Sequence, residues 1–148
     1  MTETTNGWSD AGHGNRRLRS ALVTLGKGTA TGVTAGMATF VYAQQELMAA
    51  NVDPSLLLGL TALCGVFSHL LSNTLRESIR VGMTGFFAGV VTFVGVWIAP
   101  LWVLSYSPAK RDVLLPAELG SAIVAALIIY AAAYFGGSLA GLTTDAYV

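Results

Sequence analysis

The chain has 148 residues, of which 53 % are apolar and 11 % are charged, and its mean hydropathy is positive. This apolar content exceeds what a soluble domain needs and is typical of a membrane protein. Eight acidic and eight basic residues cancel, so the chain lacks the basic field that attracts nucleic acid. Cys64 is the single cysteine and lies in an apolar run, which excludes an internal disulfide and a multi-cysteine metal site.

The N-terminal part combines a polar tail with the first apolar stretch. Residues 1–15 are polar and lack apolar periodicity, which predicts a flexible tail. An apolar stretch at about residues 21–43 follows Arg16, Arg17 and Arg19 and predicts the first helix. The paired arginines also leave open a cleaved export signal. However, the usual flanking residues are missing, and the same motif recurs deep in the chain, where no signal could be removed.

Three further apolar stretches predict helices at about residues 54–72, 81–104 and 116–142. Asp53 followed by Pro54 suits an N-cap and the first helical position. Residues 73–80 form a loop or a helical extension, and Pro100 kinks or ends the third helix. Residues 105–115 read as a loop before Pro116 opens the fourth helix, and residues 143–148 read as a short C-terminal tail.

Each of these stretches is long enough to cross a hydrocarbon core of about 30 Å at 1.5 Å per helical residue. The fold class is therefore expected to be all-α, a polytopic membrane protein with a single four-helix domain at residues 16–142. Cations set the orientation, because cytoplasmic flanks carry the Lys and Arg excess. This places both termini on the cytoplasmic side of the cell membrane, with Lys110 and Arg111 outside.

The sequence contains an internal repeat, which groups the predicted helices into two pairs. Residues 31–41 and 84–94 match at seven of eleven positions with an offset of 53 residues. The match indicates two tandem helical hairpins, at residues 16–72 and 73–142, that insert with the same orientation.

The matched stretches place small residues on one helical face and bulky residues on the opposite one. Small faces let helix backbones approach closely, so they predict helix packing. The predicted packing residues are Gly28, Gly32, Ala35, Gly36, Thr39, Gly85, Ala88, Gly89 and Thr92.

Polar side chains within the apolar stretches suggest a path for ions or small solutes as a second interpretation. The candidates for such a polar pathway are Thr31, Thr84, His69, Glu118, Tyr130 and Tyr134.

Several of these side chains also have a purely structural interpretation. His69 lacks a second ligand and would be hydrogen-bonded within the bundle. Glu118, in the first turn of a helix, would be favoured by the helix dipole. Tyr130 and Tyr134 lie one turn apart and would bond to a neighbouring helix. Lys27 would extend its ammonium group to the lipid headgroups.

The sequence carries no phosphate-binding loop after a strand and no Ser, His and Asp set, so neither an enzyme nor a bound cofactor is expected. We expect a structural or accessory membrane subunit that self-associates or joins a larger assembly through its Gly, Ala and Thr faces. The alternative is a small oligomeric channel or facilitator. The expected partners are the lipid bilayer and a second copy or another membrane protein, without nucleic acid.

Overall fold

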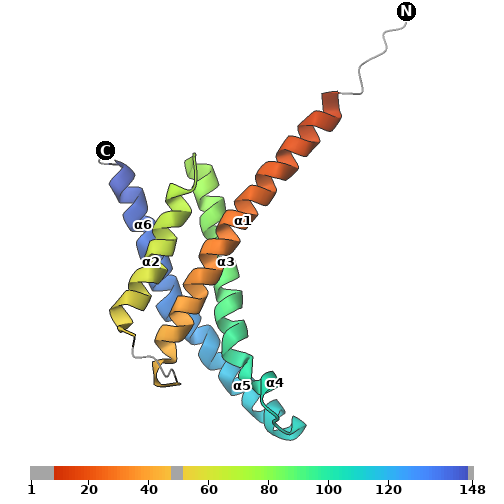
Figure 1. The fold of residues 1–148 in the computed structure, drawn as a ribbon, viewed down its shortest axis with the longest axis vertical. Coiled ribbons are helices and arrows are strands. Elements are labelled where there is room, and N and C mark those ends of the chain that lie inside the picture. Colours follow the sequence, from red (N-terminus) through yellow and green to blue (C-terminus); the bar gives the residue numbers. More distant parts are fainter. Residues whose placement is uncertain (1–8, 48–51, 147–148) are drawn as a thin grey trace, which may run out of the picture.

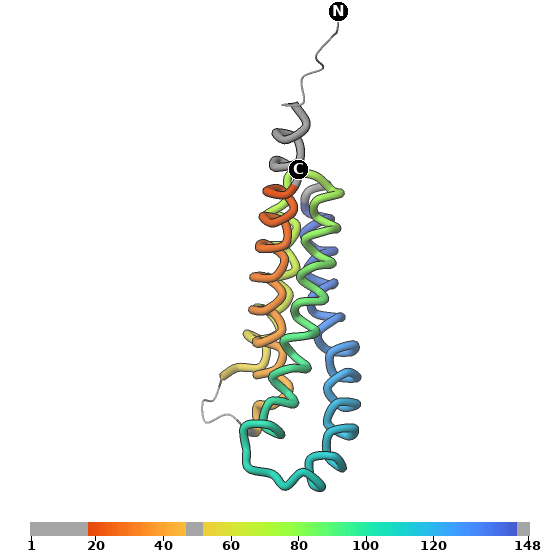
Figure 2. The backbone as a smooth tube through the Cα atoms, turned by 90° about the vertical axis from the view of Figure 1, so that its right-hand side faces the viewer, coloured from red at the N-terminus to blue at the C-terminus, as the bar shows by residue number. Residues whose placement is uncertain are grey.

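The computed structural model describes the backbone of residues 9–47 and 52–146 and the side chains of residues 18–46 and 52–144. Its described part is helical and contains no strand, which confirms the all-α fold class. The described helices are arranged as four rods, which form an elongated bundle (Figures 1 and 2).

The rods follow one another in chain order. The first is α1 (Ser9–Ala43), and a short 3-10 turn, η1 (Gln45–Leu47), comes after it. The second is α2 (Pro54–Leu70), and the third is α3 (Leu75–Ile98) with the short α4 (Pro100–Val103). The fourth rod comprises α5 (Pro108–Ala125), the π-helical turn η2 (Ala126–Tyr130) and α6 (Ala131–Ala146).

Helices extend into both of the segments predicted as tails. Helix α1 begins at Ser9, so the backbone of residues 9–15 is helical. Helix α6 continues to Ala146 and includes most of the predicted C-terminal tail. Once a helix is nucleated, each added residue gains a backbone hydrogen bond, which extends both helices into polar sequence. Residues 1–8 and 147–148 and the side chains of Arg16 and Arg17 lie outside the described part.

The prediction that Pro116 opens the fourth helix is wrong, because α5 begins at Pro108 and contains Pro116. Ser107 has an extended backbone with ψ 148°, and Pro108 occupies the first helical turn. This arrangement repeats the one at Asp53 and Pro54, since proline lacks only an N–H that would have no partner there. The predicted loop at residues 105–115 is therefore mainly helical.

Side chains cap the helices at two of the three connections between rods. Asp53 accepts hydrogen bonds from the Ser55 amide at 2.9 Å and the Ser55 hydroxyl at 2.7 Å. These bonds hold the pKa of Asp53 below its usual value, so the contribution of the cap is lost as the pH falls through that lowered pKa. Thr74 caps α3 by accepting from the Glu77 amide at 3.2 Å.

The bundle packs α1 against α3 and α2 against α6 as its two most extensive contacts. The N-terminal half of α1, the turn between α2 and α3 and the end of α6 lie at one end, and α4 lies at the opposite end (Figure 1). Among the described helices, Leu75–Val103 and Pro108–Thr144 are long and apolar enough to cross a membrane, whereas α2 is apolar but shorter, with 17 residues.

Candidate functional site

Glycine backbones form the contact between α1 and α3. A methyl group on Gly32 would overlap the Gly85 carbonyl, and one on Gly36 would lie 2.5 Å from the Gly89 carbonyl oxygen. Gly28 lies in the same way against the Val81 carbonyl. The three pairs keep one offset of 53 residues, as expected for two helices that run in the same direction with matching stretches side by side.

The other predicted packing residues lie beside this contact. Ala35 and Thr39 are fully buried, and the Thr39 hydroxyl lies 2.9 Å from the Ala35 carbonyl and 3.0 Å from the Thr61 hydroxyl on α2. Ala88 and Thr92 are half-buried, and Thr92 donates to the Ala88 carbonyl at 2.8 Å.

A second glycine contact, between α2 and α6, was missed in the sequence. A methyl group on Gly137 would overlap the Ala62 carbonyl, and one on Gly65 would overlap the Tyr134 carbonyl. The available signal was the spacing of Ala133, Gly137 and Gly141, which repeats small residues every fourth position. This contact is as close as the one between α1 and α3.

Three predicted pathway residues meet in the centre of the bundle. The Tyr130 hydroxyl donates to the Gly85 carbonyl at 3.0 Å, and the Tyr134 hydroxyl lies 2.6 Å from the Ser68 hydroxyl. Ser68 in turn donates to Thr31 at 3.3 Å. Both tyrosines are fully buried, and their stacked rings occupy the space between the helices. These hydroxyl groups therefore join helices. Ser68 was not among the predicted site residues.

The remaining pathway candidates lie apart from this cluster. His69 shares a hydrogen bond of 2.9 Å with Ser78 at the start of α3, so it is bonded within the bundle. Thr84 lies against Gly28 at the α1–α3 contact. Glu118 accepts a hydrogen bond of 2.9 Å from the Trp97 indole. The predicted first-turn role of Glu118 is wrong, because α5 begins earlier in the chain.

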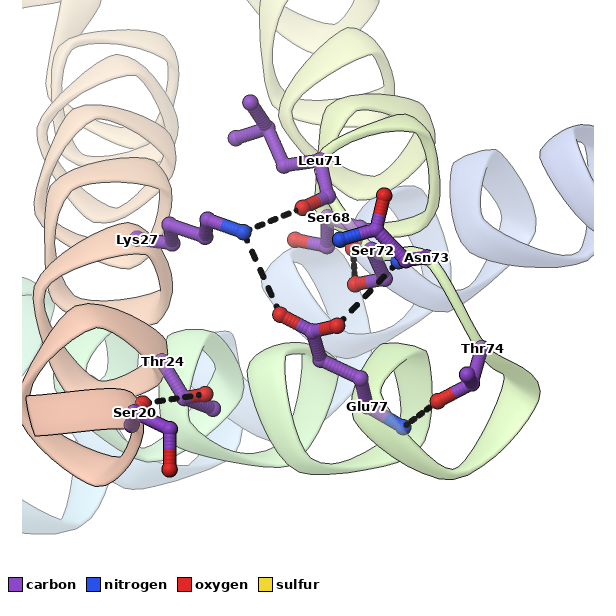
Figure 3. Close-up of polar contacts among 9 residues, drawn as sticks. All are labelled: Ser20, Thr24, Lys27, Ser68, Leu71, Ser72, Asn73, Thr74 and Glu77. Atoms are coloured by element: carbon purple, nitrogen blue, oxygen red, sulfur yellow. Dashed lines mark hydrogen bonds and ion pairs between the residues drawn. The ribbon is translucent and has the colours of Figure 1, made fainter. Parts of the chain in front are cut away.

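Lys27 joins three helices at one end of the bundle (Figure 3). Its ammonium group donates to the Leu71 carbonyl at 2.6 Å and lies 3.2 Å from a Glu77 carboxylate oxygen. The other oxygen of Glu77 accepts from the Asn73 amide at 3.2 Å. The ammonium group is thus directed toward the turn between α2 and α3, and the carbonyl that it binds is at the C-terminal end of α2, where cations are favoured.

No protein-family model, curated protein or solved structure matches the chain.

The central hydroxyl cluster leads to a test. Replacing Tyr134 with phenylalanine should lower the free energy of unfolding by about 1 kcal/mol, because it removes the hydrogen bonds to Ser68 and to the Gly82 carbonyl and keeps the ring. Reversible unfolding of the detergent-solubilised chain, followed by circular dichroism, measures the change. The control is Tyr42→Phe, in a half-buried residue of α1. Equal losses in both variants would contradict a role for the Tyr134 hydroxyl.

Proposed function

We propose that this chain is an integral membrane protein with four spans and cytoplasmic termini, and that it serves as a structural or accessory subunit of a membrane assembly. The observation that carries the proposal is the distribution of polarity. Phe87 is 60 % exposed and Val91 71 % exposed in the middle of α3, whereas Thr39, Thr61 and Ser68 are buried and hydrogen-bonded. Apolar side chains on the outside and satisfied hydroxyls on the inside suit a lipid environment.

The helix contacts support four spans rather than two. Helix α1 runs beside α3 in constant register over Gly28, Gly32 and Gly36, and α2 packs along α6. Helix α3 and the fourth rod are each long enough to cross a membrane, and each has another helix packed along it. If these two rods cross the membrane, α1 beside α3 and α2 beside α6 are expected to cross it as well. The same register supports two hairpins that insert with one orientation.

Cations support the proposed orientation. Four cations among the described side chains lie at one end of the bundle, on the N-terminal half of α1 and the start of α3: Arg19, Lys27, Arg76 and Arg80. At the opposite end, Lys110 lies 4.7 Å from the centre of the Tyr106 ring, and Arg111 lies 4.6 Å from that of Trp102. Aromatic rings beside cations are typical of a membrane interface, and the larger group of cations is expected in the cytoplasm.

Association with a partner requires a surface other than the first glycine series, because Gly32, Gly36, Gly85 and Gly89 are covered within the chain. A groove on the outside of the bundle, between α2 and α6, is such a surface. Its volume is about 540 Å³, and its lining is mainly small and apolar, with Gly59 and Gly136 exposed. We infer that a second copy or another membrane helix packs in this groove, which we call the outer groove.

An accessory subunit is favoured over a channel within one chain, because the rings of Tyr130 and Tyr134 fill the interior between the helices. Hydroxyl groups that already bond to backbone carbonyls or to one another leave few free polar groups to replace the hydration shell of a permeating ion. Ion flux in liposomes that contain the purified chain would contradict this preference.

The membrane assignment and the association are tested separately. Alkaline carbonate should leave the chain in the membrane pellet, and its release into the supernatant would contradict the membrane assignment. The detergent-solubilised chain should have the mass of an oligomer or co-purify with a membrane protein. Gly136→Leu should disrupt this association. Gly26→Leu, on an open side of α1, is the matched control. A monomer without a partner, or equal loss in both variants, would contradict the outer groove.

A further inference from the structure

An open groove separates the N-terminal half of α1 from the start of α3. The helices touch at Gly28 and Thr84, and toward its N-terminus α1 leans away from α3 (Figure 1). Two hollows, of about 550 and 920 Å³, lie in this opening and share Ser20, Thr24, Arg76 and Arg80. Because these four residues line both hollows, the hollows adjoin, and we call the two together the arginine groove.

The arginine groove carries an excess of positive charge. Arg19 on α1 and Arg76 and Arg80 on α3 line it, and all three are exposed. Among the described residues that line it, the one carboxylate is that of Glu77, which is paired with Lys27 at 3.2 Å. Within the described side chains, none of the three arginines forms an ion pair. Their guanidinium groups are therefore available to an anion, and their planar donor geometry matches a phosphate group.

The same groove continues into an apolar section. Leu25 and Met83 line its larger hollow and are 51 % and 43 % exposed, respectively. Arg80 immediately precedes the apolar part of α3, so the arginines lie at the level at which that helix would enter a membrane. A ligand that combines a phosphate with an acyl chain would contact both sections.

We propose that the arginine groove binds the phosphate group of an anionic phospholipid, with the acyl chain beside Leu25 and Met83. Lys27 fixes the wall of the groove by joining α1 to Glu77 at the start of α3 and to the Leu71 carbonyl just after α2. Among the described side chains that line the groove, the three arginines are therefore the charges without an opposite partner. The inference rests on the membrane location proposed above, and free phosphate shares the headgroup chemistry without the chain.

Binding is measured by native mass spectrometry of the full chain in a neutral detergent. The probes are dioleoyl phosphatidylglycerol, dioleoyl phosphatidylcholine and inorganic phosphate. Phosphatidylglycerol should bind most tightly. Each arginine removed should weaken its binding about fivefold, so R19Q gives about fivefold and R76Q/R80Q about 25-fold. The matched control K110Q/R111Q removes the same charge at the opposite end and should bind as the unmodified chain does.

Each other result would overturn the proposal. Equal weakening in R76Q/R80Q and K110Q/R111Q would indicate a response to net charge alone. Phosphatidylcholine binding as tightly as phosphatidylglycerol would exclude recognition of the anionic headgroup. Inorganic phosphate binding as tightly as the lipid would assign the groove to a free anion. Should R76Q/R80Q fail to fold, R19Q alone decides, because Arg19 is exposed on α1 beyond the glycine contact.

The carbonate extraction described above separates this inference from the proposed function. A chain that stays in the membrane pellet but binds both lipids equally contradicts the arginine groove alone. A chain released from the membrane contradicts the membrane assignment itself.

Discussion

Replacing Gly32 with alanine should lower the free energy of unfolding by about 1–3 kcal/mol. The added methyl group would overlap the Gly85 carbonyl, and both groups belong to helix backbone, so neither can move aside without separating α1 from α3. For the proposed membrane protein, the loss of dispersion contacts between α1 and α3 adds to the cost, because close backbone approach holds helices together in lipid. Reversible unfolding in mixed detergent micelles measures the change.

The matched control for Gly32 is Gly26→Ala, on the same helix. No atom lies within 4 Å of a methyl group built there. This substitution should leave stability unchanged or raise it by about 0.5–1 kcal/mol, because alanine favours the helix more than glycine does. A loss at Gly26 equal to that at Gly32 would mean that α1 and α3 do not meet through the predicted face.

Replacing Gly137 with alanine should also lower the free energy of unfolding by about 1–3 kcal/mol. The methyl group would overlap the Ala62 carbonyl and force α6 away from α2. Its neighbour Gly136 provides a stringent control, because a methyl group at Gly136 meets nothing within 4 Å. The two substitutions change composition identically and differ by one position along α6.

The Gly137→Ala and Gly136→Ala variants are compared by the same unfolding measurement and by the melting temperature. Gly136→Ala should leave the free energy of unfolding within about 1 kcal/mol of that of the unmodified chain, and the melting temperature close to that of the unmodified chain. If Gly136→Ala is the more destabilising of the two, α6 is rotated relative to the arrangement described, and the contact with α2 is made by the opposite face.

The small faces on α1 and α3 follow from periodicity, because helical spacing places Gly32 and Gly36 on one side. Periodicity identifies a face but not the neighbour that covers it. The sequence therefore left open whether these glycines meet another chain, whereas in the structure they are covered by Gly85 and Gly89.

Other features of the structure could not be predicted from local sequence patterns. Lys27 and Glu77 are 50 residues apart, and their pairing requires α1 and α3 to be side by side. The prediction at Pro116 is wrong because a proline in the first turn of a helix and a proline inside a helix cannot be told apart by residue type alone. In the structure the helix begins earlier, at Pro108 after Ser107. The π-helical turn at Ala126–Tyr130 has no glycine or proline to mark it.

Both glycine contacts join a helix of residues 16–72 to one of residues 73–142. For the proposed membrane protein, this governs assembly during synthesis. Helix α1 must wait for α3, which emerges 53 residues later, or about 3–10 s at ordinary translation rates. During that interval Gly32 and Gly36 lack the Gly85 and Gly89 backbone that covers them in the folded chain. The glycines of each segment are covered by the other segment, so residues 16–72 and 73–142 depend on each other to complete folding. The two segments made as separate polypeptides would keep the surfaces needed to associate.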